Sequence, residues 1–466
     1  MVFSEPTFLF GFLPFVVLAY LAVPRRFENA LLLAASLVFY VWGEGSYVIV
    51  LLVSIALNYG IGLGMDAAPE RLRKTWLWLG IAGNLVMLGY YKYWGFILEN
   101  LGIPEAARMA PKLPVGISFF TFQAMSYVID LYYRRIAIQR SFARLALYVS
   151  MFPQLIAGPI VRYSDVEAEI GARDKTRSDF VQGMERFVLG LAKKALLADP
   201  MGQVADQIFS APLEGLSPAV AWTGISVYAA QIFFDFSAYS DMAIGLGRVF
   251  GFTFPENFNY PYISRSATEF WRRWHLTLST WFRDYVYIPL GGNRVGPVRA
   301  YFNVGVVFVI TGVWHGAGWT FVIWGAYYGV LVMLEKWKIL ALLEALPRWV
   351  GHVYFLLLTW VGWILFRSED MAQTGAFARA MFLGETGARA AFHPFSRYVD
   401  GYVVFIFALA VMFSIPLGNW VGPRLRSALG ERPVRGLIIA GLWACFILSL
   451  VSVGAASYSP FIYFRF

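Results

Sequence analysis

Residues 300–334 read AYFNVGVVFVITGVWHGAGWTFVIWGAYYGVLVML and contain no Asp, Glu, Lys or Arg. Such a long apolar run is typical of membrane-crossing helices, which need about 20 residues each. His315 stands in the middle of this run. An ionisable side chain is costly inside a membrane and generally marks a site or a water-filled path, so we expect His315 to be functional. The alternative is a histidine that is only hydrogen-bonded between helices. Gly316 and Gly318 beside it lack side chains, which suggests a close approach by a ligand.

The rest of the chain has the same character. Of its 466 residues, 59% are hydrophobic and 14% charged, whereas soluble domains carry about 25% charged residues. We therefore predict an all-α, polytopic membrane protein of about 10–13 membrane helices, with re-entrant and interfacial helices around a central tunnel, in one domain over residues 1–466. The apolar runs lie at Phe8–Val23, Ala30–Val41, Tyr47–Gly64, Trp76–Trp94, Val115–Tyr133, Phe142–Val161, Phe180–Leu197, Ala219–Phe236, Ala300–Val313, Thr320–Leu334, Val353–Phe366, Tyr402–Leu417 and Gly436–Val453.

The net charge of +9 comes from basic residues in short loops. In that position they set membrane topology and meet lipid, so no nucleic-acid partner is expected. Their distribution places both termini outside the cytoplasm. If every apolar run crossed the membrane, the C-terminus would lie inside. At least one run is therefore not a full crossing, and we expect it between Phe142 and Leu197.

Residues 269–284, EFWRRWHLTLSTWFRD, do not have the composition of a membrane span. Their apolar residues recur at the spacing of one helical face, and Arg272, His275, Ser279 and Arg283 share another face. A basic amphipathic helix normally lies in the membrane interface. The sharper interpretation is that its polar face borders the mouth of an active site.

Two carboxylates, Asp235 and Asp241, fall within or beside an apolar run. Their six-residue spacing puts them on different sides of a regular helix, so we interpret them as separate anchors, around a break in the helix, or as structural ion pairs. Gln123, Ser126 and Asp130 share one face, which would line a polar tunnel or hold helices together. The four histidines are far apart in the sequence, and no metal site is expected.

Several longer motifs resemble those of the membrane-bound O-acyltransferase family. They are Trp314-His-Gly316, Phe270-Trp-Arg-Arg-Trp-His275, Asp235-Phe-Ser-Ala-Tyr-Ser-Asp241, Phe152-Pro-Gln-Leu-Ile-Ala-Gly-Pro159, Asn257-Phe-Asn-Tyr-Pro261, and the run from Trp281 to Leu290-Gly-Gly-Asn-Arg294. The similarity covers nearly the whole chain. The two ends of the chain are similar to the AlgI-like branch, whose members serve bacterial alginate O-acetylation.

This resemblance implies an acetyl-CoA-dependent O-acetyltransferase of the bacterial inner membrane that modifies an extracytoplasmic polysaccharide. It implies catalysis by His315 with His275. Arg272, Arg283 and Arg294 would hold the polyanionic donor, because arginine suits phosphate. Asp235, Asp241 and Trp314 are assigned to substrate binding. No cofactor is expected beyond the acetyl-CoA donor.

The ending Phe461-Ile-Tyr463-Phe-Arg-Phe466 is similar to C-terminal motifs of related envelope-acylation systems. A phenol has a pKa near 10, so its ester keeps much of a thioester's transfer potential. Tyr463 is therefore expected to carry the acyl group to an extracytoplasmic SGNH-type partner, unless it is only an interfacial aromatic anchor. The alternatives to alginate-like glycans are peptidoglycan or another envelope glycan. A transporter or scaffold of a polysaccharide export complex is the alternative from a different class.

Overall fold

The computed structural model describes residues 2–212, 215–384, 393–455 and 461. Within these residues the regular structure is helical, and no strand is present. The predicted all-α class is confirmed. The chain divides into two compact units, Met1–Phe187 with Tyr239–Glu256, and Val188–Ala238 with Asn257–Phe466. Two helices, α11 and α13, have residues in both units.

The first unit contains a succession of long and short helices. They are η1 (Thr7–Phe12), α1 (Leu13–Ala22), α2 (Glu28–Glu44), α3 (Val48–Ala67), α4 (Glu70–Leu88), α5 (Trp94–Asn100), α6 (Pro104–Arg108), α7 (Ile117–Tyr132), α8 (Phe142–Ser150), α9 (Phe152–Leu155), α10 (Tyr163–Gly171) and most of α11 (Arg177–Ala192).

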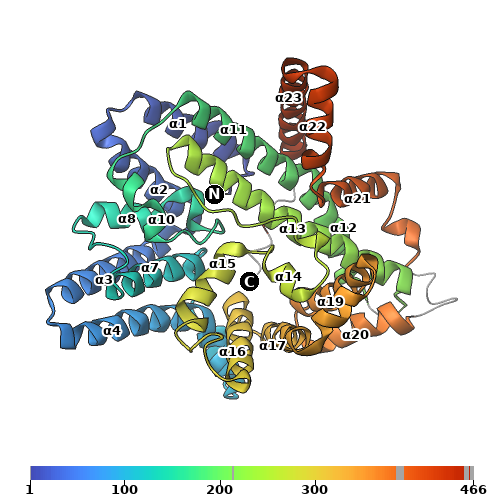
Figure 1. The fold of residues 1–466 in the computed structure, drawn as a ribbon, viewed down its shortest axis with the longest axis horizontal. Coiled ribbons are helices and arrows are strands. Elements are labelled where there is room, and N and C mark those ends of the chain that lie inside the picture. Colours follow the sequence, from blue (N-terminus) through green and yellow to red (C-terminus); the bar gives the residue numbers. More distant parts are fainter. Residues whose placement is uncertain (1, 213–214, 385–392, 456–460, 462–466) are drawn as a thin grey trace. The chain divides into compact units, whose positions relative to one another are not determined.

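Helices α3, α4 and α7 of this unit pack side by side (Figure 1). Small residues make the contact close: a Cβ on Gly64 would lie 2.5 Å from the Trp76 ring, and one on Gly62 would lie 3.0 Å from the Tyr127 hydroxyl. Close helix packing in membranes relies on such small residues.

The run Phe142–Val161 does not form one membrane-crossing helix. It is divided into α8, with nine residues, and α9, with four. At 1.5 Å per residue, α8 is far too short to cross a membrane, whose apolar core is about 30 Å thick. The prediction of an incomplete crossing after Phe142 is confirmed.

The second unit contains the main helices that follow α11. They are η5 (Lys193–Ala198), α12 (Asp199–Phe209), the start of α13 (Pro218–Val249), α14 (Ala267–Trp271), α15 (Leu276–Phe282), η7 (Arg283–Tyr287), α16 (Pro297–His315), α17 (Trp319–Leu334), η8 (Glu335–Ile339), α18 (Leu340–Ala345), α19 (Arg348–Arg367), α20 (Met371–Leu383), α21 (Gly401–Phe413), α22 (Leu417–Leu429) and α23 (Glu431–Ala455).

Several helices have the length and composition of membrane spans. In the described part of the chain there are five such stretches, or six if α21 and α22, which are bent by 80°, form one span. They lie at Arg25–Ala67, Pro218–Val249, Pro297–His315, Arg348–Arg367 and Glu431–Ala455. The first contains two helices, α2 and α3, which match two predicted runs. The protein is thus a multi-pass membrane protein, while the exact number of crossings stays a prediction.

Candidate active site

Helices α16 and α17 form a hairpin that places His315 at its turn. Pro297 occupies the first turn of α16, where its fixed φ suits a helix start. The helix ends at His315 because Gly316 is extended. Close to this end, Gly312 lies against the backbone of Gly325 on α17, and a Cβ on Gly312 would be 3.0 Å from the Gly325 Cα. Two glycines thus let the helices approach at the level of His315.

Gly316 has a packing role that the sequence interpretation did not anticipate. A Cβ there would overlap the Phe321 ring, so the space beside Gly316 is filled by the protein's own side chain. The expectation that Gly316 admits a ligand is therefore wrong. Gly318 is only in ordinary contact with Phe321, at 3.6 Å.

His315 is surrounded by aromatic rings and is only 4% exposed. Its ring centroid lies 5.0 Å from Trp314, 5.1 Å from Trp324 and 5.2 Å from Phe366. All three rings meet the imidazole edge to face, the arrangement that aromatic quadrupoles favour. The candidate catalytic imidazole therefore stands in an apolar environment that restricts access by water.

The second histidine, His275, also lies beside Trp314. The ring centroids of His275 and Trp314 are 6.0 Å apart. The Phe236 ring contacts His275 edge to face, with the centroids 4.7 Å apart. His275 has no exposed surface, and burial lowers the pKa of its imidazole to about 3. Trp314 thus contacts both histidines, and His275 is neutral at physiological pH.

Asn257 determines which nitrogen of His275 carries the proton. The backbone N–H of Thr277 and its hydroxyl both donate to Asn257 Oδ1, at 3.3 and 2.9 Å. A backbone N–H can only donate, so the acceptor is the amide oxygen. His275 Nδ1 lies 3.1 Å from the same oxygen and must therefore be the protonated nitrogen. The lone pair of the neutral ring is then on Nε2, which has no hydrogen-bond partner among the described residues.

The expected amphipathic helix over residues 269–284 is wrong. Helix α14 ends at Trp271, and α15 begins after His275, whose φ of 45° is left-handed. This conformation is costly for a residue with a side chain. It is stabilised by Asn257, whose backbone oxygen also accepts from Leu276 N–H at 2.9 Å. The apolar residues of the predicted face are nevertheless all buried: Trp271, Trp274, Leu278, Trp281, Phe282 and Tyr285.

Because of this break, the four residues of the predicted polar face do not share one surface, although Ser279 and Arg283 line the same cavity. His275 is in the core, whereas Arg272 and Arg283 are exposed and line two different cavities. Arg283 also pairs with Asp284, at 2.6 Å. Arg294 is exposed and lines neither cavity.

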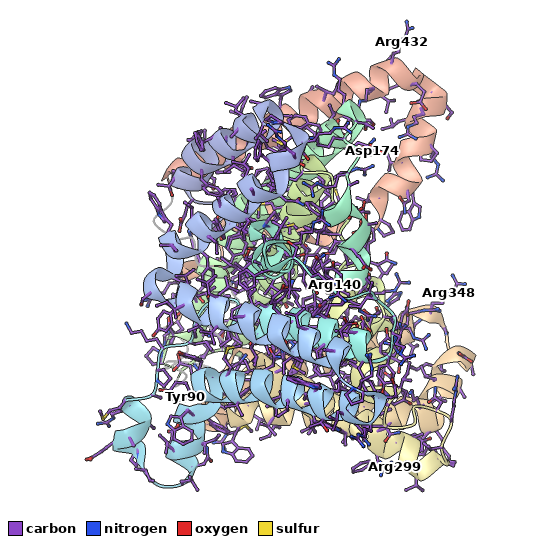
Figure 2. The ribbon with its side chains drawn as sticks, turned by 90° about the vertical axis from the view of Figure 1, so that its left-hand side faces the viewer. Tyr90, Arg140, Asp174, Arg299, Arg348 and Arg432 are labelled. Carbon is purple, nitrogen blue, oxygen red and sulfur yellow. The ribbon has the colours of Figure 1, made fainter. Side chains whose placement is uncertain are left out.

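The cavity at Arg272, here called the arginine vestibule, has a volume of about 540 Å³. Arg272 and Arg348 have no ion-pair partner among the described residues, whereas Arg273 pairs with Glu269 at 2.9 Å. Figure 2 shows the Arg348 side chain projecting outward at the start of α19. The vestibule is lined by Asn259, Arg265, Ser266, Thr268, Glu269, Arg272, Arg273, Leu340, Leu343, Glu344, Arg348 and Gly351.

The second cavity, here called the α16 slot, has a volume of about 180 Å³. Its wall includes Thr311, one helical turn before His315. Burial and the nearby Arg272 lower the pKa of Lys336, which lies at this slot. The vestibule and the slot are thus neighbours. The slot is lined by Trp271, Leu278, Ser279, Phe282, Arg283, Tyr287, Val304, Val307, Phe308, Thr311, Val332 and Lys336.

Both aspartates of α13 are in ion pairs. Asp235 lies 2.6 Å from Lys194 Nζ and is almost fully buried. Asp241 lies 2.9 Å from Arg186, which also pairs with Glu256. Helix α13 is continuous through both positions, so the suggested break between them is wrong. Their role in substrate binding stays a prediction, and Tyr463 lies outside the described residues.

Sequence reasoning missed Glu335, which has no exposed surface. Its two carboxylate oxygens accept from the backbone N–H groups of Ala267 and Thr268, each at 2.7 Å, and Tyr354 donates to it at 3.2 Å. Glu335, the first residue of η8, thereby holds the start of α14 against η8. Arg272 directly follows the end of α14. A carboxylate directly after the apolar run 300–334 was the signal available in the sequence.

Metal ligation has no support in the described part of the chain, where no group of three or more His, Cys, Asp or Glu side chains is arranged to hold a metal ion.

Comparisons with known proteins agree with these features. The sequence profile of the membrane-bound O-acyltransferase family matches residues 112–344. The chain is 37% identical over 507 residues to the probable alginate O-acetylase AlgI of Azotobacter vinelandii and 38% identical over 491 residues to that of Pseudomonas putida, with 100% of each chain covered. It is 35% identical to the peptidoglycan O-acetyltransferase of Helicobacter pylori, over 80% of this chain and 78% of the relative. The chain therefore belongs to the membrane-bound O-acyltransferase family and is a multi-pass membrane acyltransferase.

Proposed function

We propose that the protein takes acetyl groups from cytoplasmic acetyl-CoA and delivers them across the inner membrane for O-acetylation of an extracytoplasmic polysaccharide related to alginate. The names of its full-length relatives support acetylation of such a glycan. The observation that carries the proposal is the pair of buried histidines that both contact Trp314, together with a cavity lined by arginine and a slot along the helix that ends at His315.

His315 would serve as the general base. Its imidazole takes the proton of the attacking hydroxyl, the hydroxyl oxygen bonds to the thioester carbon, and the carbon–sulfur bond breaks. The leaving thiolate then receives that proton from the imidazolium, which gives CoA–SH and a neutral histidine. Such acid–base catalysis contributes roughly 10²–10⁴-fold in rate. His275 contributes a fixed hydrogen-bond acceptor at Nε2, because Asn257 holds its other nitrogen.

The two cavities suit the two ends of a CoA thioester. The arginine vestibule offers Arg272 and Arg348 to phosphate groups, for which guanidinium is a strong, directional partner. The narrower and more apolar α16 slot suits the thioester arm, and it runs beside the helix that ends at His315. Lys336 and Arg283 add positive charge at this slot.

The attacking hydroxyl in this scheme is the Tyr463 phenol, and an SGNH-type partner completes the transfer outside the membrane. An aryl ester keeps the acetyl group reactive between the two steps. Peptidoglycan is the second candidate acceptor, because a relative that covers most of the chain is a peptidoglycan O-acetyltransferase.

The test is CoA release by the purified protein with labelled acetyl-CoA, followed by transfer to alginate or peptidoglycan with the partner present. We expect His315→Ala to lose activity by at least about 10²-fold. The control, His393→Ala, removes another buried imidazole, one that pairs with Tyr398. Full activity of His315→Ala would refute the role of His315.

The donor site has its own test. Arg272→Glu should raise the KM for acetyl-CoA, because it removes an interaction made equally in the ground state and the transition state. Arg299→Glu makes the same charge change at an exposed position and should leave KM unchanged. Equal KM values for the two variants would contradict the vestibule as the donor site.

A further inference from the structure

A third cavity of the second unit lies beside α19 and the turn that joins α21 to α22. This cavity, here called the α19 cavity, has a volume of about 670 Å³, which is in the size range of ligand sites. It adjoins the arginine vestibule, and the two share Arg265, Glu269, Arg273 and Arg348. Its other residues, among them His352, Leu356 and Trp420, do not line the vestibule, so the α19 cavity has a chemistry of its own.

The shared residues give the α19 cavity an excess of positive charge. Three arginines line it together with one carboxylate, that of Glu269. Glu269 lies 2.9 Å from Arg273 and 4.0 Å from Arg265, whereas Arg348 has no ion-pair partner in the part of the chain that the structure describes. Guanidinium groups bind phosphate strongly and directionally. The charged part of the cavity therefore suits a phosphate-containing anion.

The polarity of the cavity changes along α19. Arg348, His352 and Leu356 line it at intervals of four residues, so they lie on one face of the helix. At 1.5 Å per residue, Leu356 lies about 12 Å along the helix from Arg348. Ile415 and Pro416 supply further apolar surface. Because α19 has the composition of a membrane span and begins at Arg348, the cavity runs from a charged rim to an apolar inner part.

Helix α22 indicates where this rim lies relative to a membrane. It is bent by 80° from the apolar helix α21, and none of its residues is buried. Trp420, Val421 and Leu425 are exposed apolar residues of this helix, and Arg424 and Arg426 are basic. A basic amphipathic helix of this kind lies in the membrane interface. Trp420, which lines the cavity, therefore marks the headgroup level, where tryptophan is enriched.

We propose that the α19 cavity binds an anionic phospholipid, with its phosphate at Arg265 and Arg348 and one acyl chain along α19 past Leu356. His352 Nδ1 donates to the backbone oxygen of Ser264 at 3.0 Å, which leaves Nε2 to accept from a headgroup hydroxyl. A soluble anion would satisfy the arginines and leave the apolar part unused. A zwitterionic lipid would bring a second cation to a rim that is already positive. The inference does not depend on the proposed acetyl transfer.

The test measures lipid binding to the full-length protein in detergent by native mass spectrometry. Phosphatidylglycerol should bind more tightly than phosphatidylcholine with the same acyl chains. Arg348→Gln should weaken phosphatidylglycerol binding by at least about tenfold, the loss expected for one charge-assisted hydrogen bond. Arg299→Gln is the matched control, because it removes the same charge from an exposed arginine that lines neither the α19 cavity nor the vestibule.

A second pair of variants separates a lipid from the acyl donor as the occupant. Trp420→Ala should weaken phosphatidylglycerol binding and leave the KM for acetyl-CoA unchanged, because Trp420 does not line the vestibule. Trp443→Ala, which removes an exposed ring from α23, should change neither. Equal affinities for the two lipids would overturn the inference, as would wild-type affinity in Arg348→Gln. A raised KM with unchanged lipid binding in Trp420→Ala would assign the cavity to acetyl-CoA instead.

Discussion

Gly312→Ala would insert one methyl group where α16 and α17 meet. The new Cβ would overlap the backbone oxygen of Phe321 and lie 3.0 Å from the Gly325 Cα, so backbone rather than a flexible side chain would have to move. Overpacking of this kind costs about 1–3 kcal/mol. Separation of the helices would also move His315 away from Trp324, and a misplacement of about 1 Å at a catalytic group can cost about 10²-fold in rate.

The same helix contains the matched control. At Gly305 a Cβ would meet only the Met333 methyl group, at 3.9 Å. Both substitutions gain the same helix propensity, about 1 kcal/mol, so the difference between them isolates the close contact. We expect Gly312→Ala to unfold at a lower temperature than Gly305→Ala in detergent and to release CoA far more slowly. Equal unfolding temperatures and rates for the two variants would refute the reasoning.

Three further predictions concern the residues around His275. Asn257→Ala should cost about 2–6 kcal/mol, because it removes the acceptor of buried donors in both His275 and Thr277, at about 1–3 kcal/mol for each residue; wild-type thermal stability would contradict this. Glu335→Ala should release the backbone N–H groups that begin α14 at Ala267, displace Arg272 at the end of that helix, and so raise the KM for acetyl-CoA. An unchanged KM would exclude this positioning effect. The pKa of about 3 for His275 lies below the unfolded value of 6.5, so the unfolded state binds more protons and stability should fall as pH decreases from 6.5 towards 3, by up to about 1.4 kcal/mol per pH unit. Asn257→Asp should flatten that dependence in denaturant titrations, because a carboxylate favours the protonated imidazole.

The sequence was sufficient for the features that depend on local pattern. The absence of charge over residues 300–334 predicted two helices, and α16 and α17 end within a few residues of the expected bounds. It also singled out His315, because an ionisable residue in apolar surroundings is conspicuous without a structure.

Features that depend on contacts between residues far apart in the sequence could not be predicted from local patterns. The helix break at His275 results from hydrogen bonds to Asn257, 18 residues earlier, while the spacing of buried aromatic residues continued across the break as if the helix were intact. For the same reason Arg272 and Arg283 line different cavities. Asp235 was recognised as a buried carboxylate, but its partner Lys194 belongs to another helix, and no local pattern connects them.

The aromatic wall around His315 also bears on a competing reaction. In the proposed reaction, an acyl thioester beside a general base is equally open to attack by water, and hydrolysis would discard the acetyl group before the acceptor receives it. Exclusion of water from a closed site suppresses such side reactions. With Trp314, Trp324 and Phe366 packed against the imidazole, the His315 side chain is screened from bulk solvent. In the proposed reaction, the apolar rings around His315 would therefore favour transfer of the acetyl group to the acceptor over hydrolysis of the donor.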